Sequence, residues 1–186
     1  MDIKQLSQIY RWSVIVTFLV LVVAAGSVRG QDVANGQATA NVLAALSVTA
    51  TQALQFGNVY QGVAKSQDET DDALSGIFDI VGAASAGISI YLTLPQYMAL
   101  ADGSDRMTIA FGTTDATVDT MNVTPSTVVA TDGWVDTDPN NLPGVLVVGQ
   151  AGQTNLYLGG KVIPAVDQAA GGYTGDIICN VAYNGT

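Results

Sequence analysis

A period-two alternation runs through Ala34–Thr51, and it constrains the fold of this chain more than any other stretch. Its even positions, from Ala34 to Ala50, are small or apolar, whereas its odd positions are mostly Asn, Gln, Ser or Thr. Successive side chains of an extended strand point to opposite faces, so the pattern predicts one face against a core and the other toward water. Both faces are apolar at Leu43 and Ala45, and we predict two strands joined there.

The two halves of this stretch differ in the size of their inward side chains. The first half, Ala34–Val42, has mostly small inward groups, which suit a narrow groove. The second half, Leu46–Ala50, carries larger ones and is typical of the first strand of a domain. The functional interpretation depends on whether the first half pairs within its own domain or fills a groove in another copy of the chain.

The first thirty residues have the three-part layout of a secretory signal peptide. A basic start precedes Trp12–Gly26, an apolar run of fifteen residues, and Val28 and Gly30 form a small-residue cleavage pair. The alternative, a permanent membrane anchor, usually needs about 20 apolar residues. We therefore predict cleavage before Gln31 and a secreted or cell-surface protein without a membrane segment.

The charge of the remaining chain argues against nucleic acid as a partner. The leader holds three of the six basic residues and one of the sixteen acidic residues, which leaves three against fifteen in the exported part. Such a surface repels phosphate. The remaining 156 residues are a usual size for one domain with its own core.

The residue types present exclude several common kinds of catalytic site. The chain has no His, so a Ser-His-Asp or Cys-His site cannot form, and the usual nitrogen ligand for zinc is missing. Cys179 is the single cysteine, so no disulfide can form within the chain. A glycosidase-type carboxylate pair is the remaining enzymatic possibility, but the acids Asp68, Glu69, Asp71 and Asp72 are predicted to be solvated loop residues. We predict a protein that is not an enzyme and carries no cofactor.

Three further acids, Asp132, Asp136 and Asp138, are candidate oxygen ligands for Ca²⁺ in a turn-rich stretch. They lack the D-x-D-x-D-G spacing with a downstream Glu, so the prediction remains that no metal is bound.

After Gln31 the chain consists of short strand patterns separated by turn residues, with twenty glycines and no convincing helical periodicity. The segments 61–72 and 131–143 are predicted loops. About ten short strands in one domain favour a β-sandwich with Greek-key connections. The predicted strands are Leu46–Ala50, Leu54–Tyr60, Leu74–Val81, Ile88–Leu94, Arg106–Phe111, Thr117–Val123, Thr127–Ala130, Gly144–Val148, Thr154–Ile163 and Tyr173–Tyr183.

Three sequence signatures carry a resemblance to a known family. They are L-x-L-G-G-x-V over Leu156–Val162, A-A-G-G-Y-T-G-D-I-I-C-N-V-A-Y-N over Ala169–Asn184, and L-S-V-T-x-x-x-x-L-x-F-G over Leu46–Gly57. Together they resemble bacterial fimbrial-type secreted β-sandwich domains, an uncharacterised pilin-like family, and more distantly spore-coat-U proteins and chaperone–usher pilins. The cysteine pair of many fimbrial pilins is missing, and the arm before Leu43 is short.

The resemblance implies an immunoglobulin-like sandwich that lacks its last strand, with a donor arm over 31–43 and the domain over 44–186. The chain ends directly after its terminal strand pattern, at Thr186. The arm residues implied to fill the groove are Ala34, Ala38, Ala40, Val42 and Leu43. The residues implied to border the groove are Leu46, Val48, Tyr173, Ile177, Cys179, Val181 and Tyr183.

The function implied by the resemblance is that of a structural subunit of an extracellular filament. The arm of one subunit would complete the sandwich of the next, in a homopolymer whose assembly involves a chaperone and usher in related systems. Nine residues, 34–42, span about 30 Å when extended, the length of a full groove. The alternative is a self-complete secreted adhesin or carbohydrate-binding module, in which the arm is an edge strand of its own domain.

Overall fold

The computed structural model describes residues 34–121 and 123–185 of the chain. The predicted signal peptide and Gln31–Val33 lie outside these residues. The chain divides into two units between Asn41 and Val42. Residues 34–41 of the first unit form no strand and are exposed. Among the described residues, no helix is both long and apolar enough to span a membrane.

The second unit is all-β, as the sequence predicts. Its described residues form thirteen strands and one turn of 3₁₀-helix, η1 (Pro125–Thr127). The strands are β1 (Ser47–Gln52), β2 (Lys65–Gln67), β3 (Gly76–Val81), β4 (Gly87–Thr93), β5 (Tyr97–Leu100), β6 (Arg106–Ala110), β7 (Ala116–Asp119), β8 (Gly133–Thr137), β9 (Leu146–Val147), β10 (Gln153–Leu158), β11 (Gly160–Ile163), β12 (Tyr173–Thr174) and β13 (Ile178–Tyr183).

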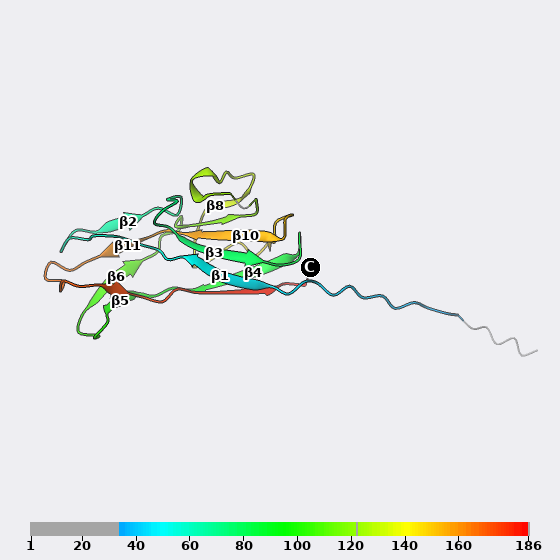
Figure 1. Ribbon diagram of the computed structural model, residues 1–186, viewed down its shortest axis with the longest axis horizontal. Helices are drawn as coiled ribbons and strands as arrows, with labels where there is room; N and C mark the ends of the chain where they lie inside the picture. Colours follow the sequence, from blue (N-terminus) through cyan, green and yellow to red (C-terminus); the bar gives the residue numbers. More distant parts are fainter. Residues whose placement is uncertain (1–33, 122, 186) are drawn as a thin grey trace, which may run out of the picture. The chain divides into compact units, whose positions relative to one another are not determined.

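Three antiparallel sheets make up this unit (Figure 1). The first has the order β1-β3-β10-β7-β8, the second β12-β5-β6-β11-β2, and the third β13-β4-β9. Strand β4 belongs to the third sheet and β5, the next strand in the chain, to the second. Strand β1 is the edge of the first sheet and β13 the edge of the third.

The main core lies between the first and third sheets, which is the arrangement of a β-sandwich. Alternate residues of β3, such as Phe78 and Ile80, pack against Ile88 and Ile90 of β4. This period of two is the one that the sequence shows, because each sheet turns one face to the core. A second apolar cluster, formed by Phe56, Met107, Ile109 and Val162, lies under the second sheet.

Strands β7 and β10 are buried on both faces, which the sequence pattern does not predict. The inward residues Val118 and Leu156 enter the core, while Asp119 and Tyr157 on the other face are equally buried. Asp119 accepts hydrogen bonds from the backbone N–H of Met121 (2.8 Å) and Val123 (2.8 Å) and from the Tyr157 hydroxyl (3.3 Å). Burial is therefore compensated by three donors to one carboxylate.

Several predicted elements differ from the structure. Residues 54–60, a predicted strand, form none, because Gly57 takes a left-handed φ of 58° and breaks the extended conformation. The predicted loops 61–72 and 131–143 contain β2 and β8, and residues 127–130 end a 3₁₀ turn instead of forming a strand. The prediction also missed β5.

The two longest predicted strands are each divided. Residues 154–163 form β10 and β11, separated at Gly159, where a Cβ would lie 2.6 Å from the carbonyl oxygen of Gln67. Only glycine allows the neighbouring chain to approach so closely. Residues 173–183 form β12, paired with β5, and β13, paired with β4, so this segment bridges two sheets.

Candidate functional site: an open seam between β1 and β13

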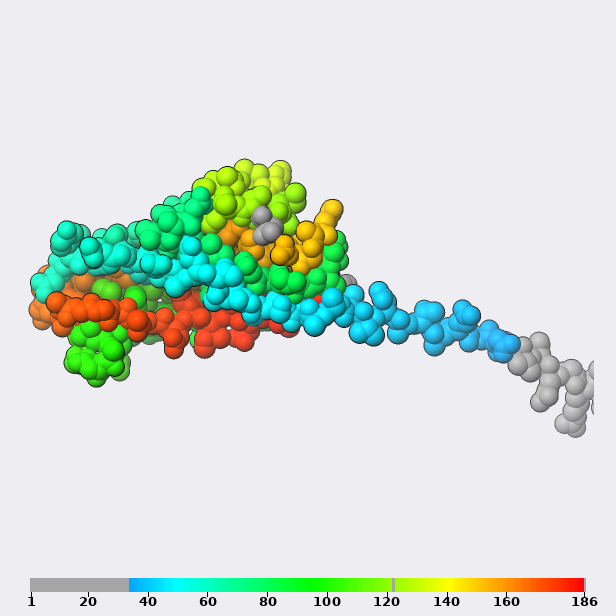
Figure 2. Space-filling view, viewed as in Figure 1, coloured from blue at the N-terminus to red at the C-terminus, as the bar shows by residue number. Residues whose placement is uncertain are grey.

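Strands β1 and β13 run along the same side of the sandwich and contact each other without belonging to one sheet. In the sheets formed by the described residues, β1 pairs only with β3 and β13 only with β4. We call the unpaired border between the two strands the seam. Figure 2 shows its borders as the cyan segment after residue 44 and the red C-terminal segment, side by side on the visible face.

Six of the seven residues that the resemblance implies as groove borders lie in β1 or β13 or directly before them, whereas Tyr173 lies in β12, which pairs with β5. All seven are half-buried. Six of them pack against the main core, and Tyr173 packs against the second cluster. The border residues are Leu46, Val48, Tyr173, Ile177, Cys179, Val181 and Tyr183. The six residues that pack against the main core remain partly exposed, so an added strand would bury more apolar surface here.

One end of the seam is tied together by Tyr183. Its hydroxyl donates a hydrogen bond to the carbonyl oxygen of Ala44 (2.8 Å) and accepts one from the backbone N–H of Ala83 (2.7 Å). The end of β13 therefore lies beside the residues that lead into β1. The two strands run in opposite directions along the seam.

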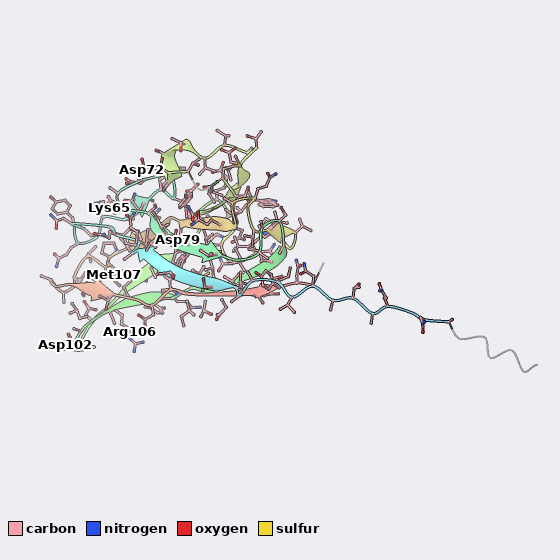
Figure 3. The ribbon with its side chains drawn as sticks, turned by 45° about the vertical axis from the view of Figure 1, so that its right-hand side comes forward. Lys65, Asp72, Asp79, Asp102, Arg106 and Met107 are labelled. Atoms are coloured by element: carbon pink, nitrogen blue, oxygen red, sulfur yellow. The ribbon has the colours of Figure 1, made fainter. Side chains whose placement is uncertain are left out.

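A pocket of about 630 Å³ lies between the segment that follows β1 and the segment around β12. One wall is the irregular segment 54–61, and the other is the segment 168–173 before β12. Met98 of β5 and Met107 of β6 also line it. Figure 3 shows Met107 and Arg106 on β6, where Met107 is buried and Arg106 is exposed. Methionines fit irregular space well because their unbranched chains adapt to it.

Asp105 fixes the wall formed by residues 168–173. One carboxylate oxygen of Asp105 accepts hydrogen bonds from Gln168 Nε2 (2.6 Å), the Tyr173 hydroxyl (2.7 Å) and the Ala169 N–H (2.8 Å). The hydrogen bonds from Ala169, Tyr173 and Arg106 lower the pKa of Asp105 to about 2. The sequence gives no signal for this role, because Asp105 ends the stretch D-G-S-D at 102–105, which is typical of an exposed turn.

We expect Asp105→Asn to lower the melting temperature at pH 7 and to lose this effect in acid. The folded-state pKa lies below the value of about 3.9 for an unfolded Asp. The stabilisation is therefore complete above pH 4 and is lost as the pH falls toward 2. Calorimetry from pH 2 to 7 checks this. Asp102→Asn is the control, because Asp102 binds only Ser104 in its own turn and should change less. A pH-independent difference between Asp105→Asn and the parent would contradict the assignment.

The predicted donor residues lie on both sides of the division between the two units. Ala34, Ala38 and Ala40 are exposed and belong to no strand. Val42 and Leu43, at the start of the second unit, expose 92% and 49% of their surface. Residues 34–43 form no strand.

The acidic residues fall into different environments. Glu69 is not solvated as predicted: it is only 5% exposed, and burial, with the nearby charges of Asp68 and Asp136, raises its pKa to about 7. Its carboxylate accepts a hydrogen bond from the hydroxyl of Thr117 in β7 (3.4 Å). Glu69 is therefore buried because its loop lies against β7. The polarity of the sequence around Glu69 could not predict this contact.

The three calcium candidates lie in one stretch of the structure. Asp138 accepts hydrogen bonds from Asn140 in its own turn, and Asp136 lies in β8 with a φ of 51°. Asp132 is half-buried before β8. No group of three or more acidic or cysteine residues suited to a metal occurs in the part of the chain that the structure describes.

Cys179 lies in the middle of the seam, and its thiol is unpaired. Burial raises the pKa of this thiol to about 11, so it is protonated at neutral pH. A protonated, half-buried thiol behaves as a small apolar side chain.

Comparison of the chain with models of known protein families and with curated proteins finds no match.

Proposed function

We propose that this protein is the structural subunit of an extracellular filament, assembled when the arm of one copy completes the sandwich of the next. The single observation that carries the proposal is the seam. Two edge strands on one side of the sandwich leave half-buried apolar side chains between them. Residues 34–42 of the same chain have an alternation that would fill such a gap.

The order of the strands supports this proposal. The sheet order β1-β3-β10-β7 matches the A-B-E-D sheet of an immunoglobulin-like sandwich, and the pair β4 and β13 matches its C and F strands. The strand that would follow F on the free side of β13 has no counterpart among the described residues. That free side is the seam.

The chemistry of strand addition supports it as well. An added strand makes main-chain hydrogen bonds with the unpaired edge, at about 0.5–1.5 kcal/mol each, and places alternate side chains in the groove. The contact joins two different surfaces of the subunit, the arm and the seam. Such a head-to-tail contact that does not close produces a fibre.

A purified chain that begins at Gln31 is expected to form filaments visible by negative-stain microscopy. An excess of a synthetic peptide of residues 34–43 should cap the seams, shorten the filaments and raise the melting temperature of the remaining free subunits. The same peptide with Ala40→Asp is the matched control and should do neither. A chain that stays monomeric, melts cooperatively and ignores the peptide would instead support the self-complete adhesin or carbohydrate-binding module.

A further inference from the structure

Glu69 is the only glutamate of the chain, and its side chain is 5% exposed in the folded subunit. We propose that Glu69 makes the position of residues 68–71 depend on pH: while it is protonated it holds them against β7, and when it ionises it releases them. This inference goes beyond the proposed function and does not depend on it, because Glu69 lies in neither the arm nor the strands that border the seam.

The first step concerns the path of the chain before Glu69. Residues 67–69 cross the junction of β10 and β11 at very short distance. A Cβ atom at Gly159 would lie 2.6 Å from the carbonyl oxygen of Gln67 and 2.7 Å from the backbone nitrogen of Glu69. Glycine at position 159 permits this approach because it has no side chain. The contact brings Glu69 onto the sandwich and takes its carboxyl group largely out of water.

The hydrogen bonds of Glu69 do not replace the lost water. Besides its own backbone N–H, the donor that its carboxyl group meets is the Thr117 hydroxyl at 3.4 Å, a long distance for such a bond. The oxygen of this hydroxyl also accepts a hydrogen bond from the backbone N–H of Asp136 (3.3 Å). Asp119, buried in the same strand as Thr117, accepts three hydrogen bonds from other residues. Glu69 is therefore much less well prepared to carry a negative charge than Asp119 is.

The charges that face Glu69 are negative. Asp68 lies beside it in the same loop, and Asp136 lies in β8. From β7 it meets the Thr117 hydroxyl, and from the junction of β10 and β11 it meets Gly159, neither of which carries a charge. An ionised Glu69 would thus lie between two carboxylates without a compensating cation from these elements, and the protonated form is favoured.

Asp68 and Glu69 share one proton between them. The hydroxyl and the backbone N–H of Thr70 donate hydrogen bonds to one oxygen of Asp68 (2.6 and 2.9 Å), which lower the pKa of Asp68. Burial, with the charges of Asp68 and Asp136, raises the pKa of Glu69 from the ordinary value of 4.5 to about 7. Protonated Glu69 donates a hydrogen bond to the ionised Asp68. The environments of the two side chains therefore keep one ionised and the other neutral.

Ionisation of Glu69 removes this hydrogen bond and adds a second negative charge beside Asp68. The carboxylate of Glu69 regains water when the loop moves away from β7. At the other end of the loop, Asp72 (labelled in Figure 3) accepts hydrogen bonds from the backbone N–H (2.8 Å) and the hydroxyl (2.7 Å) of Ser126. These bonds do not involve Glu69, so the release is confined to residues 68–71.

Urea unfolding from pH 5 to 8 at one protein concentration tests the role of Glu69. Its folded-state pKa lies above its unfolded value, so its contribution to stability is complete below pH 4.5 and is lost as the pH rises through 7. The folding equilibrium constant of the chain that begins at Gln31 should fall roughly tenfold or more between pH 5 and 8. Glu69→Gln, which imitates the neutral form, should lose this dependence. Asp167→Asn is the matched control, because Asp167 is exposed and its replacement should leave the parent's pH profile unchanged.

A protease that cuts after glutamate measures the release directly and needs no variant, since the chain has one glutamate. Cleavage between Glu69 and Thr70 is compared with cleavage of a free peptide of residues 66–73, which corrects for the pH dependence of the protease. The ratio of the two rates should rise between pH 5 and 8. Equal pH profiles of stability for the parent and Glu69→Gln would overturn the inference. A cleavage ratio that stays constant from pH 5 to 8 would also overturn it, because Glu69 would then titrate without releasing the loop.

Discussion

Ala40→Asp is expected to abolish filament formation while leaving the subunit folded. In the proposed assembly, Ala40 lies in the neighbour's seam among half-buried apolar side chains such as Val48 and Val181. An unpaired carboxylate there loses its hydration without gaining a partner, which costs several kcal/mol. A loss of about 3 kcal/mol lowers the affinity of each contact roughly 100-fold.

The matched control is Thr39→Asp, which adds the same charge one residue away on the face that the alternation turns toward water. Thr39→Asp should still form filaments, whereas Ala40→Asp should stay monomeric in sedimentation velocity and in micrographs. Because Ala40 is exposed within its own subunit, the variant should keep the parent's far-UV spectrum. It should also gain thermal stability from the unmodified peptide of residues 34–43, since its own seam is intact. Filaments of Ala40→Asp equal in number to the parent's would show that the register, or the whole proposal, is wrong.

Asp119→Ala is expected to cause the largest loss of stability of any single change considered. Asp119 is fully buried, and its carboxylate accepts hydrogen bonds from the N–H groups of Met121 and Val123 and from the Tyr157 hydroxyl. Removing the acceptor leaves two partly buried backbone N–H groups without their partner, at about 1–3 kcal/mol each. We expect the free energy of unfolding to fall by roughly 3–5 kcal/mol, a large part of the 5–15 kcal/mol typical of a domain.

Urea unfolding at pH 7 measures this loss. Asp167→Ala is the control, since Asp167 is exposed in a turn and its replacement should change the free energy of unfolding by less than about 0.5 kcal/mol. If Asp119→Ala loses no more than this control, the segment after β7 is not held by the carboxylate. The two variants have equal changes in charge, so the comparison isolates burial and hydrogen bonding.

Much of the fold could be predicted because it is decided by local pattern. In β4 and β13, the residues that alternate between the core and the surface in the structure do so in the sequence. The half-buried positions of Val48 and Val181 could be predicted on the same grounds, because each lies on the inward face of an edge strand. The free sides of β1 and β13 were implied by the resemblance alone.

The local sequence pattern could not predict other features of the structure. The pocket depends on residues 54–61 meeting residues 168–173 across more than a hundred positions, and Met98, which lines it, comes from β5, which the sequence analysis missed. Glu69 and Asp119 look like solvated acids in the sequence, since a polar residue there marks a loop or an outer face. Glu69 is buried beside Thr117 of β7, and Asp119 is buried where it binds the segment that follows β7.

By itself, the sequence determined that this chain is all-β and which face of most strands turns inward, because strand periodicity is a property of neighbouring residues. It also determined that an arm with small or apolar residues at every second position precedes the first strand. Only the tertiary structure decided that Tyr183 ties one end of the seam to Ala44 and that a pocket lies between residues 54–61 and 168–173. The reason is physical: which edges remain unpaired, and where space remains between them, follows from contacts between segments distant in the chain.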